Sequence, residues 1–515
     1  MDVVLVILPK IEADAPTVGA PLLKAILAKN GYSSKVFDFN IDLYNEMKRK
    51  GKQFEYYNHY SREFEKDYFQ RIIRVEYNYM FEKWVDEIIS LKPKYVGLSL
   101  LTYFSLNYAM KLSYMLRAKD KDLKIIWGGA GVDNATSVEG AKRNLAHYFV
   151  IGDGEDNIIN ILKGIKAPGI NDREDCIKLR TTSAQLDDLS KVIVPDYSDI
   201  NWSVYDGRVD DRVFKFTDSA YVTGSRGCVK RCTFCSVKEI WPKYRFRPAL
   251  NIVDEIKDLV INHKRKNIKF TDSLINGSMR EYRILLKELV ELKKQYPEFN
   301  WDSQWILRGE TQSPESDYAM MAESGCKRLD IGLEHFSEKV RYEMGKKFKN
   351  EDMWYCLDML RKYKISSWLL MIVGYPTETE EDHQITLDSI KEYHKRGFNV
   401  GELSFGNVLN MQIGDGTWNA VKDDIVYYNS SHDWQYKNNT PTLRLKRLKE
   451  VHDLIAKISG QPVNNHGARG MIEILTKIVN EKNMATPTGI EPVISCVTGK
   501  HLNHSTKEPL LIQLS

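Results

Sequence analysis

Three cysteines within eight residues constrain this chain more than any other feature of its sequence. Cys228, Cys232 and Cys235 follow the spacing C-x3-C-x2-C, and an aromatic residue, Phe234, stands just before the last thiol. Three thiolates in one short loop can hold three corners of a cubane 4Fe–4S cluster and leave the fourth iron open. A small molecule can bind to an open iron and be reduced there. The motif therefore predicts an enzyme whose fold wraps a loop around a cluster.

Two other interpretations of the motif are weaker. A structural zinc site needs four protein ligands, but the next cysteine is Cys326 and the nearest downstream histidine is His263. Upstream, Cys176 and His147 are also distant, so a local fourth ligand is missing. A disulfide is disfavoured because the chain has 7 cysteines, an odd number, and no signal peptide, which predicts a cytoplasmic protein. A zinc-binding module without catalytic activity stays open as an alternative.

The residues around the motif predict parallel β/α units. Residues 220–227 form a strand that ends in a loop, where Gly224 and Gly227 give the backbone room to wrap a cluster. Residues 253–260 follow as an amphipathic helix. Further strands alternate with helices of about 12–18 residues, as parallel crossovers require. With the first strand, five more candidates make about six units: 268–272, 300–305, 328–334, 367–374 and 400–405.

The order of these segments resembles the radical S-adenosylmethionine (SAM) superfamily. The resemblance covers about residues 215–420 and starts with the opening strand, the cysteine loop and the first helix. It implies an α/β fold with a partial (β/α)6 barrel of the TIM type instead of a closed eight-strand barrel. The other matching segments are 270–273, 325–335 with 344–346, 374–379 and 416–417.

The resemblance also implies the chemistry. In this family the open iron chelates SAM, and one electron cleaves SAM to methionine and a 5′-deoxyadenosyl radical, which abstracts a hydrogen from the substrate. Cys228, Cys232 and Cys235 would bind the iron, and Phe234 would lie beside the adenine. The electron would come from a donor such as a flavodoxin or a ferredoxin.

Residues at strand ends complete the expected site, because catalytic groups of parallel barrels lie at the carboxyl ends of the strands. Glu334 would accept hydrogen bonds from the ribose hydroxyls or pair with the methionine ammonium, and Asp272 would contact the ammonium. Gly374 would also lie at the cofactor. Structural roles stay open: Asp272 would then cap the following helix, and Glu334 would form an ion pair with Arg308 or Lys346.

Residues 1–165 show a second α/β pattern. Apolar strand candidates alternate with helices, which predicts a doubly wound Rossmann-like domain. Ligands of such a domain bind at the carboxyl ends of its strands, here near Ser99, Gly128 and Gly129. The strand candidates are 1–9, 35–39, 95–100, 124–129 and 148–151.

This N-terminal region resembles the cobalamin-binding domain that precedes the barrel in one class of radical SAM enzymes. The likeness is carried by residues 97–99, Gly128-Gly129 and the Gly-Asp-Gly-Glu sequence at 152–155. The Asp-x-His-x-x-Gly motif, which supplies an axial histidine in other cobalamin proteins, is absent, but many radical SAM members lack it. Cobalamin is therefore expected beside the 4Fe–4S cluster and SAM. A Rossmann-like domain that only covers the barrel stays open.

The rest of the chain divides by composition. The predicted divisions are a helical insertion at about 43–90, a linker at 166–215, the barrel at 216–420, a helical C-terminal region at 421–484 and an unstructured tail at 485–515.

Charge and hydropathy limit the partners. Lys plus Arg number 74 and Asp plus Glu 70, so the net charge of +4 does not support bulk binding of nucleic acid or of a membrane surface. The insertion interleaves aromatic and basic residues, but acidic residues are as frequent there, which disfavours nucleic acid. Apolar runs are too short to span a membrane. We expect a small-molecule or peptide substrate.

Two enzymatic functions fit this organisation. The first is cobalamin-dependent methylation or another C–H functionalisation, and the alternative is cyclisation or rearrangement without cobalamin. Sulfur insertion of the methylthiotransferase kind is disfavoured, because the N-terminal domain contains no second set of three cysteines.

Overall fold

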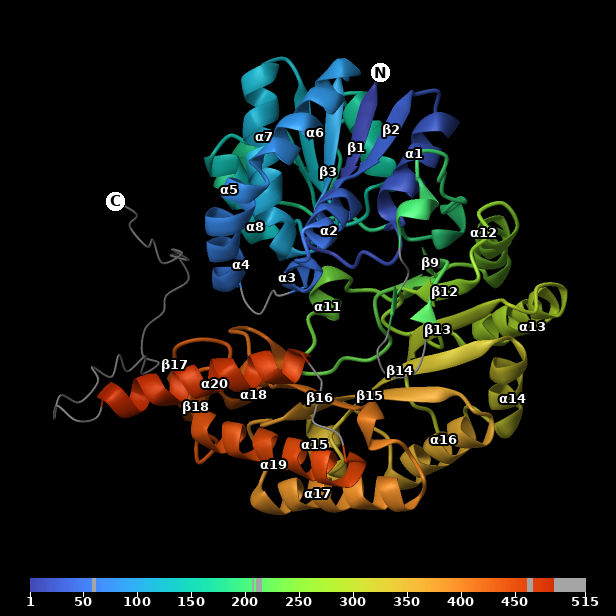
Figure 1. Cartoon of the computed structure of the whole chain (residues 1–515), viewed down its shortest axis with the longest axis vertical. Helices are drawn as coiled ribbons and strands as arrows, with labels where there is room; N and C mark the ends of the chain where they lie inside the picture. Colours follow the sequence, from blue (N-terminus) through green and yellow to red (C-terminus); the bar gives the residue numbers. More distant parts are fainter. Residues whose placement is uncertain (58–61, 206–207, 210–214, 461–465, 486–515) are drawn as a thin grey trace.

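The N-terminal part of the protein is a doubly wound α/β domain (Figure 1). The structure is a computed structural model that describes residues 1–57, 62–205, 208–209, 215–460 and 466–485. The first sheet has the order β2-β1-β3-β4-β5-β6, parallel except for β6. Its strands are β1 (Val3–Ile7), β2 (Ser34–Asp38), β3 (Tyr95–Ser99), β4 (Lys124–Gly128), β5 (Tyr148–Val150) and β6 (Ile170–Asn171).

Helices cover both faces of this sheet, because its central strands are apolar on both sides. One face packs against α1 (Gly19–Lys29) and α9 (Glu155–Leu162). The other face packs against α2 (Phe39–Arg49), α6 (Asn78–Ser90), α7 (Leu106–Lys119) and α8 (Asn134–Lys142). The predicted Rossmann-like fold is confirmed.

The segment between β2 and β3 is helical, and residues 58–61 of the predicted insertion lie outside the described residues. Between α2 and α6 it contains α3 (Gln53–Tyr56), α4 (Arg62–Tyr68), a π-helical turn η1 (Phe69–Ile73) and α5 (Arg74–Glu76).

The predicted linker at 166–215 is not uniformly irregular. Its first part forms β6 and α10 (Arg173–Ile177), which belong to the N-terminal sheet and its helices. Asn171 is buried and its amide donates to the carbonyl of Phe149 over 3.1 Å, so the segment completes the sheet edge. A strand of two residues is too short to produce a hydrophobic period in the sequence.

The second sheet is a parallel partial barrel. Its order is β16-β15-β14-β13-β12-β9, which matches the predicted (β/α)6 arrangement. The apolar outer face packs against helices that include α12 (Ala249–Ile261), α13 (Met279–Gln295) and α16 (Asn350–Lys362). The strands are β9 (Ser219–Val222), β12 (Asn267–Phe270), β13 (Asn300–Trp305), β14 (Cys326–Glu334), β15 (Ser366–Val373) and β16 (Leu403–Val408).

The last strand begins later than predicted. Residues 400–405 were expected to be extended, but Val400–Glu402 form the 3₁₀ turn η5. The side chain of Asn399 accepts from the N–H of Gly401 over 2.9 Å and stabilises this turn.

The predicted helical region at 421–484 begins with strands instead of a helix. After α18 (Gly416–Val421), a hairpin forms from β17 (Ile425–Tyr428) and β18 (Trp434–Tyr436). Two helices follow, α19 (Pro441–Ser459) and α20 (His466–Ala485), and α20 contacts β16 at the edge of the barrel sheet. Residues 486–515, which include nearly all of the predicted tail, lie outside the described residues. Among the described helices, none has the length and apolarity needed to cross a bilayer.

Candidate active site

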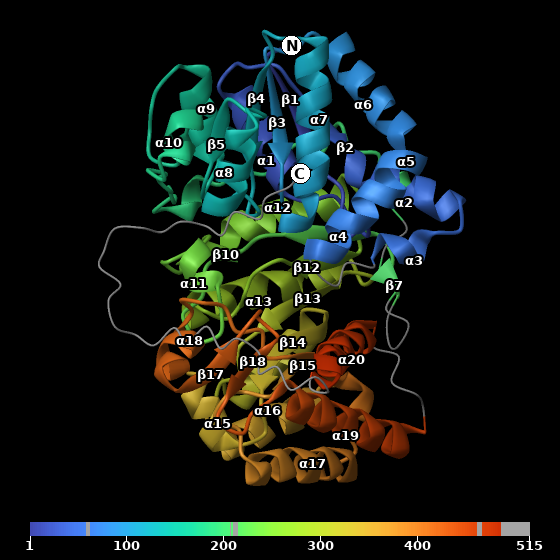
Figure 2. The ribbon, with the colours of Figure 1, turned by 90° about the vertical axis from the view of Figure 1, so that its left-hand side faces the viewer.

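The three cysteines lie in one loop that is closed at its base by a short ribbon. This ribbon pairs β10 (Ser225–Arg226) with β11 (Arg245–Phe246) in antiparallel register, so residues 227–244 form the cysteine loop. Gly227 has a φ of +86°, and a Cβ at this position would lie 2.6 Å from the carbonyl oxygen of Lys243. A glycine is therefore required where the loop leaves the ribbon. Figure 2 shows β10 and the loop helix α11 (Val237–Ile240) between the two α/β parts.

The three thiols are close enough to influence one another electrostatically. Cys232 is buried, and Cys228 and Cys235 are half-buried. Burial raises the pKa of Cys232 to about 11; Lys346 opposes this shift, while Glu334 and the other two thiols add to it. Among the described residues, no three His, Cys, Asp or Glu side chains meet closely enough to ligate one metal ion. A cubane cluster instead spreads its ligands over separate irons, and a set of three soft sulfur donors suits it.

The tip of the cysteine loop is held by the barrel. The N–H of Thr233 donates to the carbonyl of Met344 over 3.0 Å, and the N–H of Thr417 donates to the carbonyl of Thr233 over 3.0 Å. Phe234, half-buried between these contacts, packs in a cluster that includes Met344 and Tyr375. The segments 344–346 and 416–417, which match family signatures, therefore hydrogen-bond to the cysteine loop. Their spacing in the sequence did not predict this contact.

Glu334 lies beside the thiols and pairs with Lys346. It is the last residue of β14, is 7% exposed and has a φ of +68°. The Lys346 ammonium lies 2.9 Å from the Glu334 carboxylate and donates to the carbonyl of Gly332 over 2.9 Å. Burial disfavours the charge on Lys346, but Glu334 and Cys232 outweigh it and raise the pKa of this lysine. Of the two expected ion-pair partners, the structure selects Lys346.

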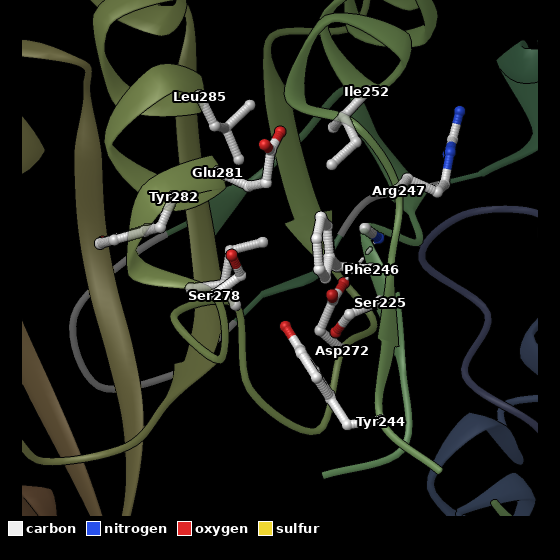
Figure 3. A pocket seen from close by; sticks show the side chains of 12 residues that line it. Ser225, Tyr244, Phe246, Arg247, Ile252, Asp272, Ser278, Glu281, Tyr282 and Leu285 are labelled. Atoms are coloured by element: carbon white, nitrogen blue, oxygen red, sulfur yellow. Dashed lines mark hydrogen bonds between the residues drawn. The ribbon is translucent and has the colours of Figure 1, made fainter. Parts of the chain in front are cut away.

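Asp272 lines a cavity beside the ribbon at the base of the cysteine loop. It follows β12 with the same alternation as Ile268 and Phe270, which pack against the helices outside the barrel. Its carboxylate accepts from the N–H of Gly224 over 2.8 Å and lines a cavity of about 20 Å³ between the ribbon, α12 and α13 (Figure 3). The alternative capping role is wrong, because α13 begins after Ser278.

Replacing Asp272 by asparagine should stabilise the protein at alkaline pH. Burial raises the pKa of Asp272 to about 7, while the hydrogen bond from Gly224 and the charge of Arg247 oppose this shift. Tyr244 and Glu281 also line the cavity. Because the folded state holds the proton up to about pH 7, wild type loses stability as pH rises from about 4 to about 7, by roughly 4 kcal/mol at most.

Urea unfolding at pH 5 and pH 8 checks this prediction. The free energy of unfolding of Asp272→Asn, relative to wild type, should be higher at pH 8 than at pH 5. The same difference should not change with pH for Asp254→Asn, an exposed position on α12. An equal difference between Asp272→Asn and wild type at both pH values would contradict the assignment.

Gly374 forms the turn after β15 and is held by a buried carboxylate. It has a φ of +81°, and its N–H donates to Oε2 of Glu378 over 2.6 Å. The other oxygen of Glu378 lies 3.8 Å from Nε2 of His335, 3.7 Å from Nδ1 of His383 and 3.4 Å from Nη1 of Arg447. His335 directly follows Glu334, so Glu378 links the turns after β14 and β15. Sequence reasoning missed Glu378, although it lies within the matching segment 374–379.

Ser99, Gly128 and Gly129 lie together at the carboxyl edge of the N-terminal sheet. Ser99 and Gly128 are register partners, and all three residues are partly accessible. Nearby on the loop after β3, Leu101 is 43% exposed and Tyr103 is 38% exposed. This edge therefore exposes two apolar side chains near a hydroxyl group and two glycines.

The second sheet is similar to a known protein family. Residues 222–405 match the family described as the Radical SAM superfamily. The ribosomal protein uS12 methylthiotransferase RimO of Clostridium botulinum (strain Eklund 17B / Type B) is 31% identical over 189 residues, which are 34% of this chain and 40% of the relative. RimO of Parabacteroides distasonis is 29% identical over 239 residues, 45% of this chain and 55% of the relative. The chain thus spans about half the length of these curated relatives or less.

Two solved structures share the fold over more of the chain. TsrM from Kitasatospora setae, described as a radical S-adenosylmethionine methyltransferase, has a TM-score of 0.54 at 17% identity and covers 76% of this chain and 71% of its own. OxsB, described as a cobalamin-dependent S-adenosylmethionine radical enzyme, has a TM-score of 0.59 at 16% identity and covers 93% of this chain and 61% of its own. At these identities the likeness shows the shared fold alone.

Proposed function

We propose that this chain, a radical SAM enzyme by its domain at residues 222–405, carries a 4Fe–4S cluster on Cys228, Cys232 and Cys235. When bound, the reduced cluster would supply the electron that cleaves SAM to methionine and a 5′-deoxyadenosyl radical. One observation carries the proposal: three interacting thiols share a glycine-closed loop beside the carboxyl ends of the barrel strands. A one-electron donor such as a flavodoxin or a ferredoxin would have to reach this loop.

Residues around the loop are suited to hold SAM. Glu334 and Lys346 present opposite charges beside the thiols, which complements the ammonium and the carboxylate of a methionine moiety. Phe234 is placed to lie against the adenine, and the Gly374 turn offers backbone at the end of β15. Asp272 is given no part in SAM binding, because its carboxylate faces the helices.

The N-terminal edge is suited to cobalamin. The exposed Leu101 and Tyr103 beside Ser99, Gly128 and Gly129 provide an apolar surface with small residues, as a large ring system requires. With cobalamin bound there, the reaction would be methylation or another C–H functionalisation of a small molecule or a peptide. Without it, the same barrel would serve a cyclisation or a rearrangement.

Sulfur insertion is a second candidate, because the relatives that match the barrel are methylthiotransferases. The cysteine content of the chain disfavours it. Cys176 alone precedes the cysteine loop, so this sequence offers no three-thiol set for a second cluster.

Anaerobic reconstitution with iron and sulfide tests the proposal. We expect about four irons and four sulfides per chain, and formation of 5′-deoxyadenosine from SAM and reductant. About eight irons would favour sulfur insertion. Absorbance of bound cobalamin would separate methylation from the cobalamin-free reactions. One zinc per chain with no cleavage of SAM would refute the proposed function in favour of a zinc-binding module.

A further inference from the structure

We infer that Asp153 of the N-terminal domain is a positioning residue for the cluster, because it holds both ends of the cysteine loop. The inference rests on the proposed function and assigns a role to the Gly-Asp-Gly-Glu sequence that links this domain to the barrel. Four charged side chains take part, Asp153, Glu155, Arg226 and Arg245, and we refer to them as the interdomain ion cluster.

The two arginines mark the base of the cysteine loop. Arg226 and Arg245 are register partners in the β10–β11 ribbon, immediately before and after residues 227–244. Oδ1 of Asp153 lies 2.7 Å from Nη1 of Arg226, while its Oδ2 accepts from Nη1 of Arg245. Glu155 also pairs with Arg226. One carboxylate therefore bridges the two strands from which the whole loop emerges.

The interdomain ion cluster is shielded from solvent. The side chains of Asp153 and Arg245 are each 6% exposed, that of Glu155 is 9% exposed and that of Arg226 is 15% exposed. Removing one member of a buried ion cluster destabilises the fold much more than breaking an exposed pair does. The reason is that the remaining charges stay buried without a partner. The contact is thus a strong constraint on the ribbon.

Asp153 is itself held rigidly. Its N–H donates to the carbonyl of Ala184 over 2.9 Å, and its Oδ2 accepts from the N–H of Leu186 over 2.7 Å. Gly152 has a φ of +96° and lies so close to the Ala184 carbonyl that a side chain would not fit. Arg245 also donates to the carbonyl of Leu186 over 2.6 Å. These hydrogen bonds therefore fix the ribbon relative to the N-terminal domain.

The barrel holds the tip of the loop through Thr233, Met344 and Thr417, and at the base it accepts a hydrogen bond from the Ser225 hydroxyl to the carbonyl of Leu274 over 3.2 Å. The N-terminal domain supplies the buried charged contacts at the base. Three thiols keep a cluster only while their spacing is held, and residues that orient metal ligands from behind typically change metal affinity by about 10–100-fold. Weakening the base should therefore release the cluster even though all three thiols remain.

Asp153→Asn in the full-length chain tests the inference. After anaerobic reconstitution, an iron chelator should bleach the cluster of the variant at least about tenfold faster than that of wild type. The electron paramagnetic resonance signal of the reduced cluster should also broaden, which a mere loss of fold stability would not cause. A wild-type bleaching rate in folded Asp153→Asn would overturn the inference.

The same loop supplies a matched control. Asp187 pairs with Lys243 of the cysteine loop over 3.4 Å, but the two side chains are 87% and 73% exposed. An exposed pair contributes little, so Asp187→Asn should bleach at the wild-type rate. Equal acceleration by both variants would refute the specific role of Asp153.

A second variant covers the case in which Asp153→Asn does not fold, as judged by far-ultraviolet circular dichroism. Glu155→Gln removes one of the two carboxylates on Arg226 and leaves Asp153 in place. It should bleach faster than wild type, and an unchanged rate would overturn the inference. Failure of the proposed function is distinguishable, because wild type itself would then take up no cluster.

Discussion

Cys232→Ala should abolish cluster retention and SAM cleavage. Cys232 is the most buried of the three thiols, and the described cysteines outside the loop are buried in the hydrophobic cores of the two α/β parts. Loss of a direct ligand should exceed the effect of outer residues, so iron content and 5′-deoxyadenosine formation should fall below about one per cent of wild type. Iron analysis and chromatography of the reaction products measure both quantities.

Cys356→Ala is the matched control for this prediction. Cys356 is fully buried in α16 and packs in the barrel core, away from the loop. Its replacement removes one sulfur from a helix interior and should leave the iron content unchanged. Full retention of the cluster in Cys232→Ala, or its loss in Cys356→Ala, would contradict the assignment of the ligands.

Glu378→Gln should destabilise the barrel by roughly 3–5 kcal/mol. Glu378 is buried, accepts from the N–H of Gly374 and faces His335, His383 and Arg447. A glutamine of the same size would leave these groups without a compensating charge. The turn at Gly374 would also lose its charged acceptor, so we expect weaker binding of SAM. Urea midpoints and equilibrium dialysis with SAM measure the two effects.

The loss of stability caused by Glu378→Gln should depend on pH. Burial disfavours the charge on Glu378, but His335, Arg447 and the Gly374 N–H outweigh it and lower the pKa of this carboxyl group. The stabilisation is therefore present above the ordinary pKa of 4.5 and is lost as pH falls through the lower folded value. The stability difference between wild type and Glu378→Gln should shrink in acid.

Glu380→Gln controls for the charge change. Glu380 also pairs with Arg447, over 3.2 Å, but its side chain is 63% exposed. Such a pair is screened by solvent, so this variant should unfold close to the wild-type midpoint. A similar loss in Glu380→Gln and Glu378→Gln would show that burial of the network is not the cause.

Most barrel strands were predictable because strands alternate with helices along this part of the chain, as parallel β/α units require. β13 has the predicted bounds, Asn300–Trp305, and β15 differs from its prediction by one residue at each end. The β17–β18 hairpin and β6 were not predicted. Both are short: β17 and β18 form a two-stranded sheet of their own, and β6 has 2 residues, so neither shows a local hydrophobic period.

Asp272 shows what a closer use of periodicity would have predicted. A residue that shares its alternation with Ile268 and Phe270 must face the same side of the sheet as these core residues. The sequence therefore contained the signal that this carboxylate faces the helices. The predicted strand at 268–272 included Asp272, whereas β12 ends at Phe270.

Three candidate ligands for the proposed cluster and the α/β class of both parts of the chain could be predicted from the sequence alone. These features are local, since the thiols share one loop and strands alternate with helices along the chain. Three charged contacts became known from the folded protein: Lys346 pairs with Glu334, Glu378 joins two turns, and Asp153 contacts an arginine 92 residues further along the chain. Charged partners that are far apart in the sequence form no recognisable motif, because only folding brings them together.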